Sequence, residues 1–374
     1  MKVLDMALQR LQKTVEEPRK VLDEYLAQGK KVVGCFPVYV PEELVHAAGM
    51  IPMGLWGGQV TPTKAAKYNP ISTCSIMRSC LEFGMTGKYK GISCAIMPML
   101  CDTYRGMSAG WRAGVKDIPL ASFIHPQNRD NVFAQYFLTA EYHTLATRIE
   151  KLTGAKIDDD KLNASIEVYN THSRVMMNFT QVANDHLDVI NPIVRHAVMK
   201  SAVFMTKEEH TAAVQEIIDE LDKLPKHDWK GKKVILTGIT AEPDNFLSIF
   251  IENNIAVVGD DIAQESRQYR TLIPIGNNPW DRLSQQWINR WGCSTVHETE
   301  FSRGKMLVDM AKNSGASCVV ICLMRFCDVE EYDSVLITDE VKAAGLHCLC
   351  LDIDQSTQNN EQSRTKLQSF AELF

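Results

Sequence analysis

The side chains of this sequence that could take part in the most kinds of chemistry are its eleven cysteines. Their number is odd, no CxxC pair occurs, and the first residues, MKVLDMALQRLQ, lack the apolar core of an export signal. A disulfide framework is therefore not expected, and thiols in such a chain are free, metal-bound or catalytic. Six lie inside apolar strand-like or helical patterns and are expected to fill the core as small apolar side chains. These six are Cys80, Cys94, Cys318, Cys322, Cys348 and Cys350.

The other five cysteines fall in loops or where apolar runs end. Ligands of open parallel sheets bind beyond the carboxyl ends of the strands, so thiols at these places can meet. Cys35 follows the first apolar run, Cys74 lies in the loop after the second, and Cys293 has no clear place in the pattern. Cys101 and Cys327 end two matching apolar runs, one in each half of the chain. Two domains that face each other across a cleft could therefore bring Cys74, Cys101 and Cys327 together.

Three converging thiolates favour a soft metal centre. Thiolates suit an iron–sulfur cluster better than a hard cation, and three ligands would leave one iron with an open coordination position. An open position is what a metal needs in order to bind a substrate or another small ligand. The competing interpretation is that these thiols are free or buried, because widely spaced cysteines form no compact motif.

Motifs of several large enzyme classes do not occur in the sequence. GxGxxG does not follow the apolar run that begins near residue 32 or the one that begins near residue 234, and both GxxxxGK[ST] and HExxH are missing. These absences argue against a dinucleotide-binding fingerprint, a P-loop ATPase and a zinc hydrolase of the HExxH type.

The elements that would position the cysteines occur twice. The sequence GKKV occurs at residues 29–32 and again at residues 231–234. Each time it begins an apolar strand, which is followed by a loop and by a helix with acidic residues in its first turn. A second pair of apolar runs, GISCAIMPMLCD at 91–102 and GASCVVICLMRFCD at 315–328, ends in Cys-Asp both times. Two pairs of repeated segments in the same order indicate a duplicated βαβ-type domain. Continuous apolar runs are typical of parallel strands that helices cover on both faces.

The predicted fold is α/β, with two related Rossmann- or flavodoxin-like parallel-sheet domains and a helical region between them. Residues 1–28 are predicted to form one N-terminal helix and residues 29–130 the first α/β domain, with Cys74 and Cys101. Apolar residues recur at helical spacing over residues 131–228, which are predicted to form the helical region. Residues 229–374 are predicted to form the second α/β domain, with Cys327.

The composition is that of a globular chain. It has 374 residues, of which 45% are hydrophobic and 23% charged, and its formal net charge is −6. A negative balance argues against nucleic acid as the main partner. The apolar run at 318–324 is far too short to span a bilayer. We therefore expect a cytoplasmic protein that binds neither nucleic acid nor a membrane.

Several short motifs carry a resemblance to a known family. The Cys-Ser after YNPIST, the CD at 101–102 and the FCD at 326–328 resemble the pattern of the 2-hydroxyacyl-CoA dehydratases and their benzoyl-CoA reductase relatives. VPEELVHAAGMIPMGLWG resembles the N-terminal segment of that family. DIDQSTQNNEQSRTKLQSF, which includes Gln362 and Arg364, resembles its C-terminal segment. The resemblance covers essentially the whole chain, and in length and detail it is strongest to the smaller, β subunit of the 2-hydroxyisocaproyl-CoA type.

The resemblance implies a [4Fe–4S] cluster held by three cysteines, which correspond here to Cys74, Cys101 and Cys327. The fourth iron would be open or bound by an exogenous ligand. The resemblance also implies a heterodimer with a homologous α subunit and an ATP-dependent iron–sulfur activator protein that delivers one electron. The implied reaction removes water from an (R)-2-hydroxyacyl-CoA, through a ketyl radical, to give a 2-enoyl-CoA. The acyl-CoA would bind mainly to the α subunit, and the cluster of this chain would relay electrons.

Other functions remain compatible with the same residues. A subunit of the benzoyl-CoA reductase type would share the cysteines, and a noncatalytic electron-transfer or structural subunit would act mainly through its dimer surface. A cluster-free, flavodoxin-like binding module would leave the three cysteines unexplained.

Residues next to the cysteine loops have both a functional and a structural interpretation. Asp102 and Asp328 either tune a bound cluster or cap the helix that follows. Arg105 and Arg325 either balance the charge of a cluster or form surface ion pairs.

Residues near the presumed cleft have a similar ambiguity. Tyr39 and Glu43 either contact a substrate or cluster, or they pack and cap. His125 is a candidate base or a loop histidine. Met97, Met99 and Met324 either form a dry wall around a cluster or fill the core.

Overall fold

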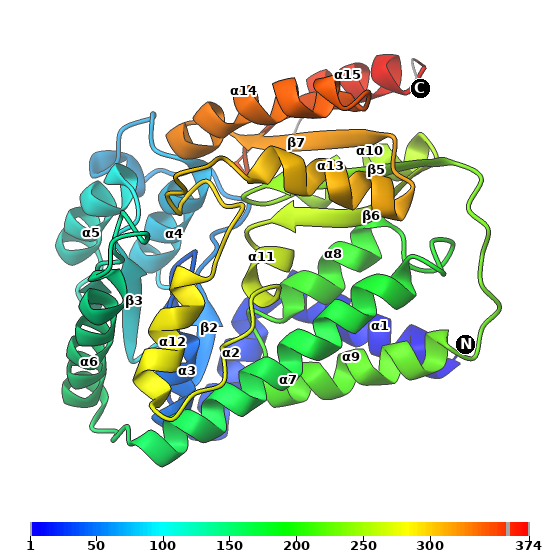
Figure 1. Ribbon diagram of the computed structural model, residues 1–374. Coiled ribbons are helices and arrows are strands. Elements are labelled where there is room, and N and C mark those ends of the chain that lie inside the picture. The colour runs from blue at the N-terminus through cyan, green and yellow to red at the C-terminus, as the bar shows by residue number, and fades with distance from the viewer. Residues whose placement is uncertain (1, 357–359, 373–374) are drawn as a thin grey trace.

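The computed structural model describes residues 2–356 and 360–372, and it contains two four-stranded sheets (Figure 1). Residues 357–359, which fall within the C-terminal family-like segment, lie outside the described part of the chain. The strands of the first sheet are β1 (Val32–Cys35), β2 (Ile51–Gly54), β3 (Cys94–Pro98) and β4 (Leu120–Phe123). Those of the second are β5 (Lys232–Gly238), β6 (Ile255–Ile262), β7 (Cys318–Met324) and β8 (His347–Ile353).

The two sheets have the same topology. The order is β2-β1-β3-β4 in the first sheet and β6-β5-β7-β8 in the second, and all neighbouring strands are parallel. In both sheets the first strand of the domain lies between the second and the third. The predicted α/β class with two related parallel sheets is therefore confirmed. Both pairs of repeated sequence segments fall on corresponding strands of the two sheets.

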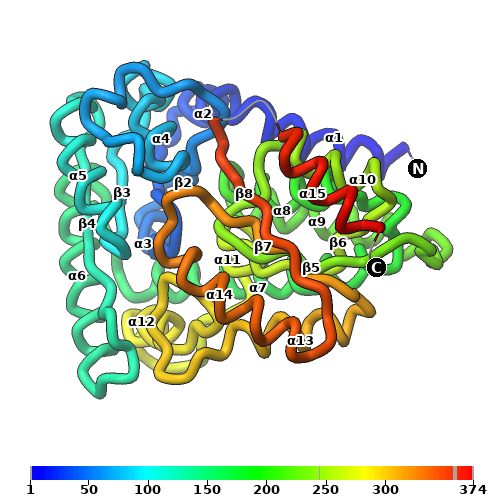
Figure 2. The backbone as a smooth tube through the Cα atoms, turned by 90° about the horizontal axis from the view of Figure 1, so that it is seen from above, coloured from blue at the N-terminus to red at the C-terminus, as the bar shows by residue number. Residues whose placement is uncertain are grey.

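Helices follow the strands of both sheets. Those of the first half are α3 (Glu42–Ala47), α4 (Ser75–Met85) and α5 (Asp102–Gly114), with the short 3-10 helix η1 (Ala65–Lys67). Those of the second half are α10 (Asp244–Glu252), α11 (Ser266–Tyr269), α12 (Pro279–Ile288), α13 (Arg303–Ser314), α14 (Asp328–Ala343) and α15 (Glu361–Ala371). Figure 2 shows α5 beside the first sheet and α13, α14 and α15 beside the second.

The N-terminal segment differs from the prediction of a single helix. It forms two helices, α1 (Lys2–Glu16) and α2 (Pro18–Ala27). Pro18 is the reason, because a proline lacks the N–H of a continuing helix but suits the first position of a new one.

The segment between the sheets is helical. Its helices are α6 (Ala134–Thr153), α7 (Asp159–Ala183), α8 (Pro192–Ser201) and α9 (Lys207–Leu221). All of it except α6, which packs against the first sheet, contributes to a separate core. Leu4 and Leu11 of α1 pack with Met176, Val198 and Ile217 of this segment. Figure 1 shows α1, α7, α8 and α9 together below the second sheet.

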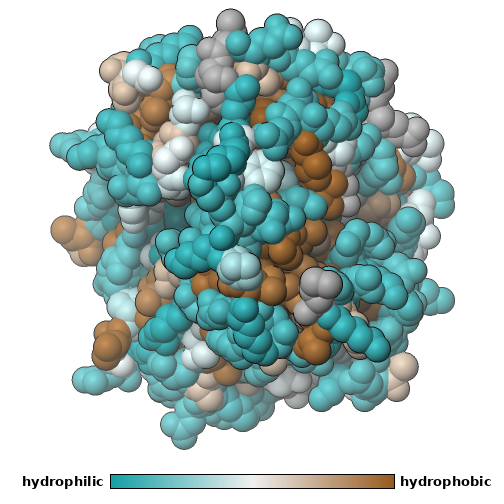
Figure 3. Space-filling view, turned by 90° about the vertical axis from the view of Figure 1, so that its right-hand side faces the viewer, coloured by the Kyte–Doolittle hydropathy of each residue, from teal (hydrophilic) through white to brown (hydrophobic). Residues whose placement is uncertain are grey.

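A continuous apolar core joins the two halves. It extends from Val33 and Ile96 in the first sheet to Val234 and Val320 in the second. The face of the molecule in Figure 3 is mostly hydrophilic, with apolar side chains gathered in narrow strips. Among the described helices, none combines the length and the apolar character needed to cross a membrane.

Candidate functional site

Three cysteines stand at the beginnings of three helices. Cys74 is the residue before α4, Cys101 is the residue before α5, and Cys327 is the residue before α14. After the carboxyl end of a parallel strand, the chain turns into the following helix at that edge of the sheet. The β3–α5 connection therefore places Cys101 at this edge, and the β7–α14 connection places Cys327 there. Cys74 reaches the same edge through the longer loop after β2.

The three cysteines line one cavity of about 400 Å³ between the two halves of the molecule. Each of the three is half-buried. Met77, Met99 and Leu100 from the first half and Ile239 and Met324 from the second form apolar parts of its wall. The cavity is therefore a largely apolar chamber with three sulfur atoms around it.

The electrostatics of the cavity favour thiols over free thiolates. Burial raises the pKa of Cys74 to about 11 and also raises the pKa values of Cys101 and Cys327. Thiolate charges on neighbouring cysteines raise the pKa values of Cys74 and Cys327 further. Backbone N–H groups of Met77, Tyr104 and Glu330, in the first turns of the three helices, act in the opposite direction. Three thiolates at this place therefore require a cationic group in the cavity.

The spacing of the three cysteines distinguishes between two kinds of metal site. In residues 2–356 and 360–372, no three His, Cys, Asp or Glu side chains meet closely enough to hold a single metal ion. An iron–sulfur cluster binds its thiolate ligands at separate irons, so cysteines spaced around a chamber suit such a group. The sulfur-only donor set and the positive ends of three helices suit it as well.

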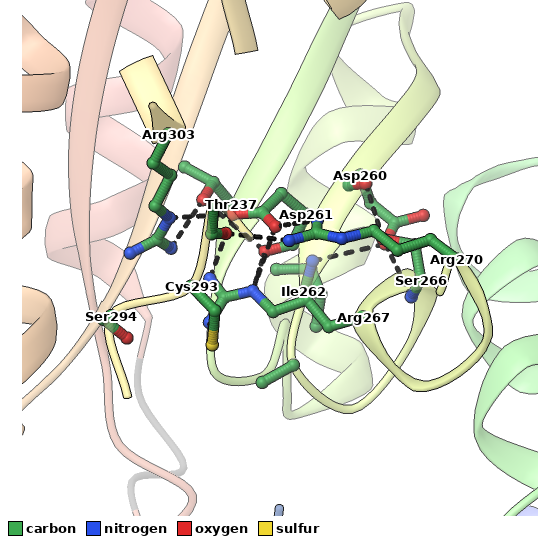
Figure 4. Close-up of polar contacts among 12 residues, drawn as sticks. Thr237, Asp260, Asp261, Ile262, Ser266, Arg267, Arg270, Cys293, Ser294 and Arg303 are labelled. Carbon is green, nitrogen blue, oxygen red and sulfur yellow. Dashed lines mark hydrogen bonds and ion pairs between the residues drawn. The ribbon is translucent and has the colours of Figure 1, made fainter. Parts of the chain in front are cut away.

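A buried ionic network lies directly behind Cys327. Glu330 of α14 accepts hydrogen bonds from Arg267 Nη1 at 3.1 Å and from Arg303 Nη2 at 2.9 Å. The same arginines donate to Asp261 at the end of β6, at 3.0 Å from Arg267 Nε and 2.9 Å from Arg303 Nε. Figure 4 shows Arg267, Arg270 and Arg303 converging on Asp261. The network fixes the first turn of α14, and thus Cys327, to the second sheet.

The two remaining candidate cysteines do not line this cavity. Cys35 is buried at the end of β1. Cys293 is buried beside Arg267, whose Nη1 lies 3.4 Å from the sulfur, and it accepts a hydrogen bond from Tyr39 Oη at 3.1 Å. Burial opposes ionisation of Cys293, but the Arg267 charge and hydrogen bonds from Thr295 and Tyr39 hold its pKa below the usual value.

Tyr39 and Glu43 belong to a second, smaller cavity. This cavity has a volume of about 60 Å³, and Tyr142, Glu265 and Arg290 also line it. Burial raises the pKa of Glu43 to about 7. Tyr39 and Glu43 are absent from the lining of the cysteine cavity, whose wall includes their neighbours Pro37 and Val38, so of the two interpretations the structure favours packing.

The charged residues of the cysteine loops lie at the surface. Asp102 and Asp328 are the first residues of α5 and α14, so the helix caps are Cys101 and Cys327 themselves, which corrects the expected capping by aspartate. Arg105 lies 3.8 Å from Asp102. Arg325 similarly lies 3.9 Å from Asp352. Such exposed pairs contribute about 0–1 kcal/mol.

His125 is not poised to act as a base. It is buried, its ring stacks on Trp287 at 3.9 Å, and neither ring nitrogen has a hydrogen-bond partner. Burial and the nearby Arg290 charge lower its pKa to about 3.

A GMSAG sequence at 106–110 matches the GxSxG motif of a serine nucleophile, but it lies inside α5 rather than at a strand-to-helix turn.

Sequence reasoning did not find the buried ionic network. Arg267, Arg303 and Asp261 come from separate elements, and no local pattern marks an arginine that will be buried. Glu330 carries a weak signal, because it lies three residues after Cys327, at the spacing of an N-terminal helix contact.

Comparisons with known proteins find a matching family model and relatives that cover nearly the whole chain. The model of the family HGD-D, described as 2-hydroxyglutaryl-CoA dehydratase, D-component, matches residues 37–374. Lactoyl-CoA dehydratase subunit beta of Anaerotignum propionicum is 41% identical over 99% of both chains. The (R)-phenyllactyl-CoA dehydratase beta subunit of Clostridium sporogenes is 41% identical over 96% of both chains. The beta subunit of (R)-2-hydroxyglutaryl-CoA dehydratase of Acidaminococcus fermentans is 33% identical over 98% of both.

All three relatives are named as subunits of dehydratases, which are hydro-lyases. The resemblance of the sequence motifs to the 2-hydroxyacyl-CoA dehydratases is thereby confirmed. The chain belongs to the family of the 2-hydroxyglutaryl-CoA dehydratase D-component.

Proposed function

We propose that this chain is the β-type subunit of a 2-hydroxyacyl-CoA dehydratase and that Cys74, Cys101 and Cys327 hold a [4Fe–4S] cluster. The observation that carries the proposal is the meeting of these three cysteines, from three connections and both halves of the chain, around one apolar cavity. The names of the relatives support the reaction class. The reaction would eliminate water from an (R)-2-hydroxyacyl-CoA through a ketyl radical of the substrate.

Such a cluster, when bound, supplies storage and transfer of one electron at low potential. The residues of this chain have three tasks around it. The cysteines bind it, and the first turns of α4, α5 and α14 stabilise the thiolate charge with their N–H groups. Apolar side chains such as Met77, Met99 and Met324 would give the cluster a largely apolar surrounding, which helps to set its potential.

The partner is proposed to be a homologous α subunit, because the relatives are named as beta subunits. The acyl-CoA would bind mainly to that subunit, and an ATP-dependent iron–sulfur activator would supply the electron. Phe326 lines the cysteine cavity and is 40% exposed, and α14 next to it exposes Tyr332, Val335 and Leu336. A partner that covers this apolar strip would also close the cavity.

Iron and acid-labile sulfide, measured on complex purified without oxygen, test the proposal. We expect about four of each for this chain, and a loss of this iron in Cys74→Ser, Cys101→Ser or Cys327→Ser. Cys350→Ser is the matched control, because Cys350 is exposed and lies outside the cavity. Wild-type complex without iron in this chain, or an equal loss in the control, would contradict the proposal.

A further inference from the structure

Tyr104 is the only tyrosine that lines the cysteine cavity in the described part of the chain. It lies in the first turn of α5, three residues after Cys101, and its backbone N–H donates to the Cys101 carbonyl oxygen at 3.1 Å. Helical side chains tilt toward the amino end of their helix, so the phenol ring is directed back toward the end at which Cys101 stands. Tyr104 is 6% exposed and belongs to the core that joins the two halves.

The hydroxyl of Tyr104 forms no hydrogen bond with a protein group in residues 2–356 and 360–372. The other hydroxyl groups that line the cavity are already bonded, since Thr103 bonds to Cys101 and Thr295 Oγ1 lies 3.2 Å from Cys293 Sγ. A phenyl ring has nearly the same volume, so packing alone does not require a hydroxyl at this place. The Tyr104 hydroxyl is therefore available as a donor to a group in the cavity.

The electrostatic surroundings of Tyr104 show that its hydroxyl lies near all three cysteines. Burial raises the pKa of Tyr104, and thiolate charges on Cys101, Cys74 and Cys327 are among those that raise it further. Because the effect of a charge weakens with distance, a hydroxyl that responds to all three thiolates lies close to each of them. The phenol keeps its proton at neutral pH, and a protonated phenol is a donor for which a negatively charged sulfur is a favourable acceptor.

The equivalent positions of the other two cysteine helices carry different side chains. Glu330 stands three residues after Cys327, but its carboxylate belongs to the buried ionic network and does not line the cavity. Met77 stands three residues after Cys74 and lines the cavity without a hydrogen to donate. Among these three positions, only Tyr104 brings an O–H donor to the cavity.

Tyr104 also differs from the charged groups at the opening of the cavity. The cavity meets solvent where the exposed Asp102, Arg105 and Phe326 line it. Water at this opening screens the charges of Asp102 and Arg105. A hydrogen bond from the buried Tyr104 is screened much less, so it acts more strongly on a group that the cysteines hold.

We propose that the Tyr104 hydroxyl donates a hydrogen bond to an iron-bound sulfur in the cysteine cavity and thereby raises the reduction potential of the cluster. The inference rests on the proposed function, because it requires a cluster held by the three cysteines. In the redox step an external one-electron donor loses one electron and the cluster gains it. The phenolic proton stays on Tyr104, so no covalent bond forms or breaks.

The physical reason is a difference between the two oxidation states. Reduction adds one negative charge to a group that three thiolates already hold. A hydrogen bond to a more highly charged acceptor is stronger, so the bond from Tyr104 stabilises the reduced state more than the oxidised state. Potentials of iron–sulfur clusters respond to hydrogen bonds at their sulfur atoms. The electron donor would therefore reduce the cluster of this chain more easily.

The test is the midpoint potential of the iron–sulfur group of this chain, titrated without oxygen in the intact complex and followed by electron paramagnetic resonance. The signal of this chain is the one that disappears in Cys327→Ser. We expect Tyr104→Phe to keep its iron and to have a lower potential. At a fixed applied potential the ratio of reduced to oxidised cluster should fall on the order of tenfold, which is about 59 mV for a one-electron couple.

Tyr142→Phe is the matched control. Tyr142 is also buried, but it lines the smaller cavity and not the cysteine cavity. We expect this variant to keep the wild-type potential. Iron content and urea unfolding are measured on every variant, because a role in packing alone would change stability and leave the potential of the loaded cluster where it is.

A measurement on the wild type does not depend on the folding of any variant. Complex is produced with tyrosine deuterated at the two ring positions beside the hydroxyl, and the reduced cluster is examined by deuterium electron–nuclear double resonance. We expect a deuterium coupling in the signal of this chain, because Tyr104 lines the cavity. The coupling should be retained in Tyr142→Phe and lost in Tyr104→Phe.

Two results would overturn the inference while leaving the proposed function intact. One is iron-loaded Tyr104→Phe with the wild-type potential, or with a shift that Tyr142→Phe reproduces. The other is iron-loaded wild type without a deuterium coupling to the cluster of this chain. Wild type without iron in this chain would overturn the proposed function, and the inference with it.

Discussion

Glu330 shows how a single buried residue positions the candidate site. Its carboxylate accepts hydrogen bonds from Arg267, Arg303 and Ser294, and its side chain is fully buried. Burial raises the pKa of Glu330, but the two guanidinium charges outweigh burial and hold the pKa below its usual value. A buried ion pair is not in itself strong evidence of stability, yet removing one partner leaves an unbalanced buried charge.

Glu330→Gln is therefore expected to destabilise the chain by about 3 kcal/mol, because two buried guanidinium groups lose a carboxylate. Urea unfolding at neutral pH measures this change. Glu331→Gln is the control, since Glu331 is the exposed neighbour on the same helix turn. Equal stabilities of the two variants would mean that the network does not hold α14 in place.

His125 determines part of the pH dependence of stability. Its pKa is about 3 in the folded chain and about 6.5 in an unfolded chain, because burial and Arg290 disfavour the charged ring. The unfolded chain then binds more protons between these two values, so this contribution is present above pH 6.5 and is lost as the pH falls toward 3.

His125→Phe is expected to reduce the loss of stability between pH 6.5 and pH 4, because a phenyl ring can stack on Trp287 and cannot be protonated. His143→Phe serves as the control, since His143 also stacks on a tryptophan but is exposed. Unfolding curves over this pH range decide the matter, and parallel curves for wild type and His125→Phe would refute the explanation.

At the scale of elements, helix α14 has two roles. Its first turn follows Cys327 and enters the buried ionic network, and its outer face exposes apolar side chains. Phe326, just before it, has a left-handed backbone with φ of 64°. This conformation costs roughly 1–2 kcal/mol for a residue other than glycine, and it turns the chain from β7 so that Cys327 faces the cavity.

The double substitution Val335→Glu and Leu336→Glu is expected to prevent assembly with the α subunit, since two charges would enter the proposed apolar interface. Both side chains are exposed in the chain alone, so folding should be retained. Size-exclusion chromatography of co-expressed subunits measures assembly. Asp309→Lys provides a charge change at an exposed position of α13, outside the proposed apolar strip, and it should assemble normally. Full assembly of the double variant would place the interface elsewhere.

At the scale of the whole molecule, the cysteine cavity connects the two halves. Cys74 and Cys101 belong to the first half and Cys327 to the second, so a group bound by all three links them. A ligand that binds only the folded chain stabilises it by mass action. Binding across both halves should also make their unfolding more cooperative.

Loading with iron and sulfide is expected to raise the melting temperature of the chain, because only the folded state brings the three cysteines together. Cys327→Ser should lose this increase, while Cys350→Ser should retain it. Anaerobic scanning calorimetry measures both. An equal increase in Cys327→Ser would show that the group binds without the second half.

Local patterns in the sequence determined the parallel strands, their duplication and the cysteines that follow them. Strand composition is a local property, and a parallel strand presents the residue after its end at one edge of the sheet. The placement of Cys101 and Cys327 could therefore be predicted before the fold was known. The break at Pro18 was missed, although proline carries a local signal there.

Only the tertiary structure decided the contacts behind the cavity. Tyr39 and Cys293 are 254 residues apart, and Arg267 and Glu330 come from helices on different connections. Whether a charged side chain is buried depends on what other elements bring to it, which no local spacing records. For the same reason Tyr39 and Glu43, which the sequence places near the cleft, line a separate cavity, because the packing of α3, α7 and α12 encloses them there.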